Sequence, residues 1–168
     1  MLLSIEESIS NLKLIVCEVE GVVTDGLIPY DEMGNVPFKN FSHKDLEAVN
    51  KLRTDYKFVF VSKYGEINYS FFRRKNIPFY IMDKNSLSTI HKIAEKYSVT
   101  YDEILYIGSN HSDFTVMRAI PFSMCPSDAA LDIQQIAALK LNSPGGNGPL
   151  CDAVSFINRR EYANKERS

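Results

Sequence analysis

Short apolar runs alternate along the chain with longer segments in which apolar residues recur every three to four positions. The runs are rich in Val, Ile and Phe, as buried strands are, and the longer segments have the period of amphipathic helices. Strands alternating with helices predict an α/β fold, a Rossmann-like parallel sheet with helices on both faces. The expected strands are 13–19, 56–62, 79–82, 103–108, 122–125 and 139–141, and the expected helices are 45–54, 65–75, 86–98, 111–119, 127–138 and 149–159.

Residues 27–42 interrupt this alternation. Met33, Gly34 and Asn35 have turn chemistry and lie between two arms rich in β-forming residues, which predicts a projecting β-hairpin. A two-stranded ribbon is only marginally stable alone, so its apolar side should be covered, either by its own domain or by another chain. No linker divides the sequence, and we expect a single domain over 1–168 with a frayed polar tail at about 160–168.

Composition and charge narrow the function classes. The chain has 168 residues, 45% of them hydrophobic and 24% charged, which is ordinary for a globular domain. Its formal net charge of −2 predicts no strong attraction to nucleic acid or to an anionic membrane. We expect no membrane span and no signal peptide, because no apolar stretch reaches about 18 residues and the first residues lack a basic start. Three cysteines at unrelated spacings fit a reducing, cytoplasmic compartment.

The stretch KLIVCEVEGVVTDG, residues 13–26, carries the strongest chemical signal. An apolar run ends in Glu18 and Glu20, two positions apart, and a glycine follows at once. Residues two apart in an extended strand point to the same side, and open α/β sheets bind ligands at the carboxyl ends of their strands. We therefore expect both carboxylates to face a crevice at this edge. The alternative is that they are ordinary polar residues at a strand end.

The order and spacing of several motifs resemble the haloacid dehalogenase (HAD) phosphatase superfamily over about residues 12–158. These motifs are the stretch after the first strand, the hairpin, Ser62 at a strand end, a lysine before a helix, the turn Gly108–Asp113 and the late loop Ser143–Gly148. More narrowly, the chain resembles the capless branch that includes 3-deoxy-manno-octulosonate 8-phosphate phosphatases and the C-terminal domain of acylneuraminate cytidylyltransferases.

The resemblance implies catalytic roles for four residues. Glu18 stands where the family has its nucleophilic aspartate, and Glu20 where a second aspartate passes a proton to the leaving oxygen; each is one methylene longer. Ser62 would hydrogen-bond the transferring phosphoryl group. The family lysine aligns with Ser86, so Lys84, two residues earlier, is the candidate for its charge; the alternative is a solvated surface lysine. The implied substrate-binding residues are Gly21, Ser62, Lys63 and Lys84.

The resemblance also implies magnesium, which the family binds with acidic residues of the turn that corresponds to Gly108–Asp113. Here Ser109 and Asn110 replace two of those acids, and Asp113 keeps its carboxylate. Magnesium prefers hard oxygen ligands, typically carboxylates and waters. We therefore expect weak magnesium binding or none. The candidate ligands are Glu18, Glu20, Asn110 and Asp113.

Assembly is implied by the same branch, whose hairpins gather at the centre of a homotetramer. We therefore expect a homotetramer through 27–42. In that branch an arginine commonly stands at the position of Asn147, and the late loop can approach a neighbouring subunit's site. Asparagine cannot supply that charge for a phosphate or a sugar carboxylate.

Three functional hypotheses follow. Because Glu18, Glu20, Ser86, Ser109 and Asn110 all depart from the family pattern, the first is a HAD-fold protein with impaired or absent phosphatase activity and an assembly or binding role. The second is a magnesium-dependent phosphatase with a reorganised site that acts on a 3-deoxy-2-ulosonic (sugar-acid) phosphate. The third is a sensor of a small ligand or metal in the same pocket.

Overall fold

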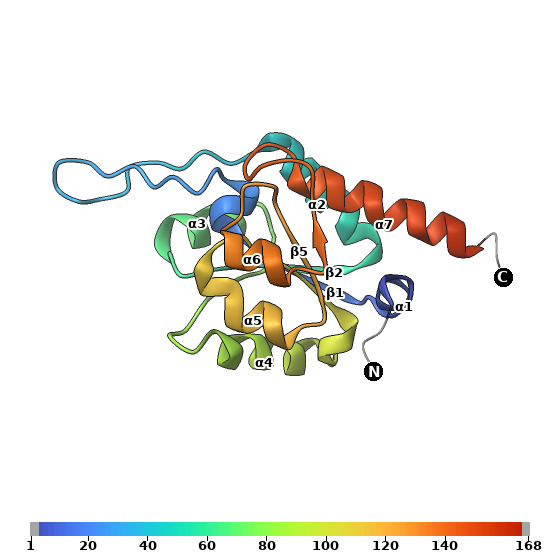
Figure 1. Ribbon diagram of the computed structural model, residues 1–168. Coiled ribbons are helices and arrows are strands. Elements are labelled where there is room, and N and C mark those ends of the chain that lie inside the picture. The colour runs from blue at the N-terminus through green and yellow to red at the C-terminus, as the bar shows by residue number, and fades with distance from the viewer. Residues whose placement is uncertain (1–3, 166–168) are drawn as a thin grey trace.

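The computed structural model describes residues 4–165 and has a single parallel sheet at its centre (Figure 1). The strand order is β3-β2-β1-β4-β5-β6, and every neighbouring pair is parallel. This confirms the predicted α/β class. The strands are β1 (Leu14–Glu18), β2 (Lys57–Ser62), β3 (Phe79–Ile81), β4 (Ile104–Ile107), β5 (Phe122–Cys125) and β6 (Leu139–Lys140).

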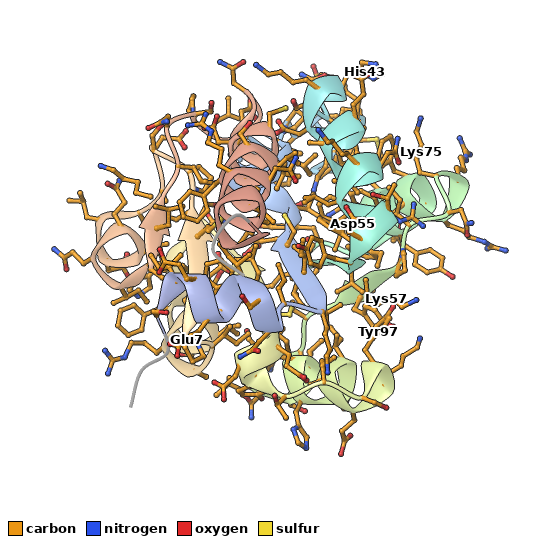
Figure 2. The ribbon with its side chains drawn as sticks, turned by 90° about the vertical axis from the view of Figure 1, so that its right-hand side faces the viewer. Glu7, His43, Asp55, Lys57, Lys75 and Tyr97 are labelled. Atoms are coloured by element: carbon orange, nitrogen blue, oxygen red, sulfur yellow. The ribbon has the colours of Figure 1, made fainter. Side chains whose placement is uncertain are left out.

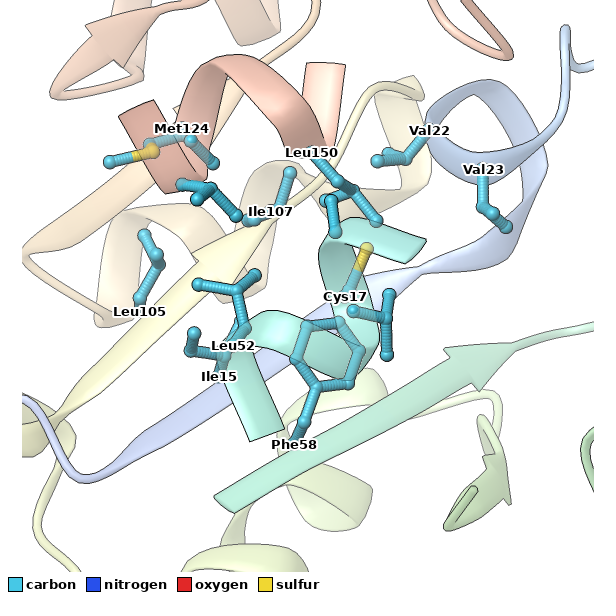
Figure 3. Close-up of a cluster of buried hydrophobic side chains, with 14 of the residues drawn as sticks. Ile15, Cys17, Val22, Val23, Leu52, Phe58, Leu105, Ile107, Met124 and Leu150 are labelled. Carbon is cyan, nitrogen blue, oxygen red and sulfur yellow. The ribbon is translucent and has the colours of Figure 1, made fainter. Parts of the chain in front are cut away.

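Helices cover both faces of this sheet, because alternate residues of the buried strands point to opposite sides. Ile15 and Cys17 of β1 pack with α1, α2, α3 and α7, in the cluster partly shown in Figure 3. Leu14 and Val16 pack with α4, α5 and α6. The helices are α1 (Ile5–Asn11), α2 (His43–Asp55), α3 (Glu66–Arg74), α4 (Ser86–Tyr97), α5 (Phe114–Ala119), α6 (Leu131–Ile136) and α7 (Pro149–Lys165).

The outer sides of the helices are polar. In Figure 2 the labelled side chains of Glu7 on α1 and His43 on α2 lie on the solvent side of their helices. None of the helices in the described part of the chain is long and apolar enough to cross a membrane.

The boundaries differ from expectation mainly in two helices. Helix α6 is confined to Leu131–Ile136, because residues 127–130 form a turn after Pro126. Helix α7 continues to Lys165, beyond the expected end at residue 159. The predicted frayed tail is therefore helical at its start, and residues 166–168 lie outside the described part.

Residues 27–42 project from the domain as two extended arms (Figure 1), but within this range no strand is formed. The arms meet at a turn in which the backbone N–H of Asn35 donates to Asp31 Oδ1 at 2.8 Å and the N–H of Met33 donates to the same atom at 2.9 Å. The side chain of Asp31 thus takes donors that a strand ladder would use. The segment is a projecting loop whose arms are not paired as β-strands.

Aromatic packing anchors the base of this loop. The ring of Phe41 stacks on Phe71 of α3 with a centroid distance of 3.9 Å and meets Phe72 edge-on at 5.6 Å. Phe72 in turn stacks on Phe60 of β2 at 4.3 Å. The second arm is therefore fixed to its own domain just before α2 begins.

Candidate functional site

The candidate site lies where β1 ends between β2 and β4. The chain runs from β1 to β2 and β3 on one side and then crosses over to β4 on the other side of β1, and in open α/β sheets such a reversal of strand order creates a crevice at the carboxyl ends of the strands. Glu18 is the last residue of β1, and Ser62 is the last residue of β2. The structure therefore brings these two predicted residues to the same edge.

The strand does not continue to Glu20, contrary to the expectation that both glutamates share one extended strand. The chain turns sharply after Glu18, and Gly21 takes φ +83°. A Cβ atom at Gly21 would also collide with the side chain of Ser109. Both carboxylates are buried at this edge, but the turn gives each its own partners.

Glu20 is held by polar side chains from three elements. Its Oε2 accepts a hydrogen bond from the Ser62 hydroxyl at 2.6 Å, and its Oε1 accepts one from Asn68 Nδ2 at 2.8 Å. The ammonium group of Lys39, from the projecting loop, forms an ion pair with Oε1. Asn68 Nδ2 also lies 3.0 Å from Ser62 Oγ, so the four side chains form one buried network.

Glu18 faces a different partner, Asp113. Burial raises the pKa of Glu18 well above its ordinary value, and the charge of Asp113 and a side-chain hydrogen bond between the two act in the same direction. Asp113 accepts further hydrogen bonds from the Tyr106 hydroxyl at 2.8 Å and from the backbone N–H groups of Ser109 and Asn110, both at 2.9 Å. Asp113 is thus held by three donors of its own segment, and the raised pKa of Glu18 favours the protonated form of that buried side chain.

The turn Gly108–Asp113 also contacts the backbone of the turn that carries Glu20. Ser109 Oγ donates to the Glu20 carbonyl oxygen at 3.0 Å, and Asn110 Nδ2 donates to the same oxygen at 2.8 Å. The two residues that replace family acids therefore act as donors to a backbone carbonyl. His111, next in the chain, pairs with Asp132 at the surface.

The residues present do not fit a magnesium site as arranged. Magnesium needs several free oxygen ligands, whereas the oxygens of Asp113, the carboxylate of Glu20 and the Glu20 carbonyl all accept hydrogen bonds from protein groups. Among the described residues, no group of three or more His, Cys, Asp or Glu side chains is arranged to hold a metal ion.

The lysines predicted to bind the substrate lie outside the buried network of Glu20. Lys63 lines a cavity of about 370 Å³ between the projecting loop and the start of α3. Lys84 is exposed, and in the described part of the chain no hydrogen bond or ion pair joins it to Glu18, Glu20 or Asp113. Ser86 begins α4. The cavity is lined by Asn35, Val36, Lys39, Lys63, Tyr64, Gly65, Glu66, Ile67 and Asn68.

The late loop 143–148 packs on its own chain. The N–H of Gly146 donates to the Val22 carbonyl at 2.8 Å, and the N–H of Gly145 donates to Asp128 Oδ1 at 2.9 Å. Asn147 accepts a hydrogen bond from Lys44 at 2.6 Å. The loop thus lies over the turn that carries Glu20.

Two residues of the buried network were not among the sequence candidates. Asn68 lies one helical turn before Phe72 on the buried side of α3, so a polar residue on an apolar stripe was its signal. Lys39 had no comparable signal, because nothing in the sequence of the loop shows which of its residues folds back onto the sheet.

No protein-family model matches the chain. It is 24% identical to the 3-deoxy-D-manno-octulosonate 8-phosphate phosphatase of Haemophilus influenzae over 158 residues, which cover 90% of this chain and 86% of that protein. The cobalt-bound structure of the Haemophilus influenzae phosphatase has a TM-score of 0.84 at 22% identity, and the alignment covers 91% of each chain.

Two further structures have the same fold. The HAD superfamily (subfamily III A) hydrolase from Legionella pneumophila has a TM-score of 0.86 at 20% identity, covering 94% of this chain and 87% of that one. The 3-deoxy-D-manno-octulosonate 8-phosphate phosphatase from Moraxella catarrhalis, solved with magnesium, phosphate and KDO, has a TM-score of 0.83 at 17% identity, covering 92% and 90%. The expected resemblance is confirmed: the chain has the HAD hydrolase fold and is similar, over nine tenths of its length, to sugar-acid phosphate phosphatases.

Proposed function

We propose that this chain is a HAD-fold assembly or binding protein whose phosphatase activity is impaired or absent. One observation carries the proposal: the carboxylates at the carboxyl end of the sheet are occupied by the protein's own groups. Glu20 is paired with Lys39, Asn68 and Ser62. Glu18, at the position of the family nucleophile, is buried and close enough to Asp113 for that carboxylate to raise its pKa.

Phosphoryl transfer depends on positioning and electrostatics, and it needs a charged nucleophile in line with phosphorus. The raised pKa of Glu18 favours its neutral form, and a neutral carboxyl group is a poor nucleophile. The extra methylene displaces each carboxylate by about 1 Å, and displacements of that size cost about a hundredfold in rate. Ser62 donates to Glu20 and is therefore not free to donate to a phosphoryl oxygen.

The projecting loop supports an assembly role. Leu27, Tyr30, Met33 and Phe38 are 75%, 62%, 87% and 57% exposed. An unpaired projecting segment with this much apolar surface is marginal alone. We propose that a second copy of the chain covers it, in a homotetramer centred on residues 27–42.

The alternative is a magnesium-dependent phosphatase that acts on a 3-deoxy-2-ulosonic (sugar-acid) phosphate. The cavity of about 370 Å³ favours it, because Lys63 and Tyr64 line a space next to the buried network in which an anionic sugar would fit. In this alternative Glu18 is the nucleophile, Glu20 the acid/base, and Gly21, Ser62, Lys63 and Lys84 contact the substrate. Glu18, Glu20, Asn110 and Asp113 would have to rearrange to hold the metal. The Moraxella catarrhalis phosphatase in complex with KDO supports the substrate class.

Phosphatase turnover and the mass of the protein in solution distinguish the two proposed functions. The protein would be assayed with magnesium against an aryl phosphate and a panel of sugar-acid phosphates, with Glu18→Ala as the matched control. Light scattering would give the mass in solution. We expect no turnover above the Glu18→Ala background and the mass of a tetramer. Turnover that Glu18→Ala abolishes would establish the phosphatase and end the proposal.

A further inference from the structure

The ion pair between Lys39 and Glu20 differs from the other ion pairs in its burial. Among the described residues it is the one ion pair in which both side chains are buried, with exposed fractions of 3% and 5%. A buried lysine is costly to desolvate, and it is retained as a cation only where it is paired and hydrogen-bonded.

Two hydrogen bonds and one aromatic ring hold the Lys39 ammonium group. One goes to Glu20 Oε1 and one to Asn68 Oδ1 at 3.2 Å, and the ammonium also lies 5.1 Å from the centre of the Tyr64 ring. A lysine ammonium has three donors, and a ring face attracts a cation at this distance. The surroundings are thus built for a cation.

Glu20 is equally complete. Both carboxylate oxygens accept hydrogen bonds, and no buried side-chain nitrogen or oxygen of the described residues is left without a partner. The charge of Glu20 is therefore balanced inside the chain, at the carboxyl edge of the sheet, whereas two proteins of the same fold were solved with cobalt or with magnesium. Lys39 comes from the projecting loop, two residues before Phe41, so the same contact fixes the loop to the sheet.

We propose that Lys39 is a built-in cation that balances Glu20 in place of a divalent metal and latches the second arm of the projecting loop to the domain. The pocket is then metal-independent, and the arm 36–42 stays closed over it. This inference goes beyond the proposed function and does not depend on it, because it concerns folding and loop closure, whereas turnover is measured separately.

The test compares Lys39→Met with Lys63→Met, a lysine that lines the same cavity and forms no ion pair with Glu20 in the described structure. Breaking a buried pair leaves an uncompensated charge, so Lys39→Met should lower the folding equilibrium constant by at least about a hundredfold. Lys63→Met should change it severalfold at most. Hydrogen exchange at residues 36–42 should accelerate in Lys39→Met and not in Lys63→Met.

Two further measurements identify the cation role. The double variant Lys39→Met/Glu20→Gln should recover most of the lost stability, because it removes both charges. Millimolar magnesium should raise the melting temperature of Lys39→Met and leave the native protein unchanged. If Lys39→Met does not fold, Lys39→Arg should still fold with its loop protected, and the double variant carries the comparison. The proposal is overturned if magnesium raises the melting temperatures of native and Lys39→Met protein equally. It is also overturned if Lys39→Met and Lys63→Met lose equal stability, or if the double variant is no more stable than Lys39→Met.

Discussion

The carboxylate of Asp45 on α2 accepts hydrogen bonds of 2.9 Å from the backbone N–H groups of Gly148 and Leu150, at the start of α7. The first N–H groups of a helix have no partner inside the helix, and here a side chain from another helix supplies it. Asp45 is fully buried. One aspartate thus joins α2 to the last residue of the late loop and to the start of α7.

We expect Asp45→Asn to destabilise the fold by about 1–3 kcal/mol, because an amide offers one acceptor oxygen and would bury an NH₂ group against a backbone donor. Chemical denaturation measures the loss. Asp55→Asn is the control, since Asp55 ends the same helix and is exposed. A loss no larger for Asp45→Asn than for Asp55→Asn would contradict the capping role.

Strands and helices of this fold were predictable where burial follows a simple period. Strand β5 occupies the expected residues 122–125, because prolines bound an apolar run on both sides. The paired arms expected in 27–42 did not form. Tyr30 and Phe38, one on each arm, are more than half exposed, and strand propensity is expressed mainly when a pleated surface is half-buried.

The location of the candidate site could be predicted from the sequence, but the partners of its carboxylates could not. Glu18 and Ser62 end two strands and Asp113 follows a third, and all three strands end at one edge, so their meeting is a consequence of topology. The partner of Glu20 is different, because Lys39 comes from an irregular loop whose path depends on Phe41 packing on α3. The spacing of residues in the sequence does not predict the path of such a loop.

The pH dependence of stability should report on Glu18. Its pKa in the folded protein is raised well above the ordinary 4.5, so the folded state holds a proton that the unfolded chain releases. The contribution of Glu18 to the free energy of unfolding is fully present below the pKa that it has in the unfolded chain. It is lost as pH rises through the pKa that it has in the folded protein. Glu18→Gln keeps a hydrogen-bond donor toward Asp113 and removes the titration.

We therefore expect Glu18→Gln to unfold at a higher urea concentration than the native protein at pH 8 and at a similar concentration near pH 4. Urea midpoints across this range measure the difference. Glu7→Gln is the control with the opposite sign, since hydrogen bonds from Ser4 lower the pKa of this exposed carboxyl. A native profile that rises with pH and is unaffected by Glu18→Gln would show an ionised Glu18.

The contact between Gly145 of the late loop and Gly21 of the turn after β1 should not tolerate an added methyl group. A Cβ atom at Gly145 would lie 2.7 Å from the carbonyl carbon of Gly21 and also collide with its oxygen. We expect Gly145→Ala to cost about 1–3 kcal/mol, as overpacking does. Gly65→Ala is the control, because its Cβ would meet the flexible end of Ile81 at 3.0 Å. Equal unfolding free energies for the two variants would show that the late loop moves freely.

Assembly through the projecting loop should depend on its exposed apolar side chains. The double variant Leu27→Ser/Phe38→Ser removes two of them from the arms, and both are more than half exposed in the single chain. We expect light scattering to show a monomer for this variant and a tetramer for the native protein, because the loss of buried apolar area weakens each interface. The thermal unfolding of the domain itself should change little when both are compared at concentrations where they are monomeric.

Leu131→Ser is the matched control for that variant, since Leu131 on α6 is 77% exposed and lies outside the loop. It removes a similar apolar side chain and should leave the tetramer intact. If Leu131→Ser dissociates the assembly and the loop variant does not, the interface lies on the α6 side of the domain. In that case the apolar residues of 27–42 would need another partner, because four such side chains on a projecting segment are costly to leave in water.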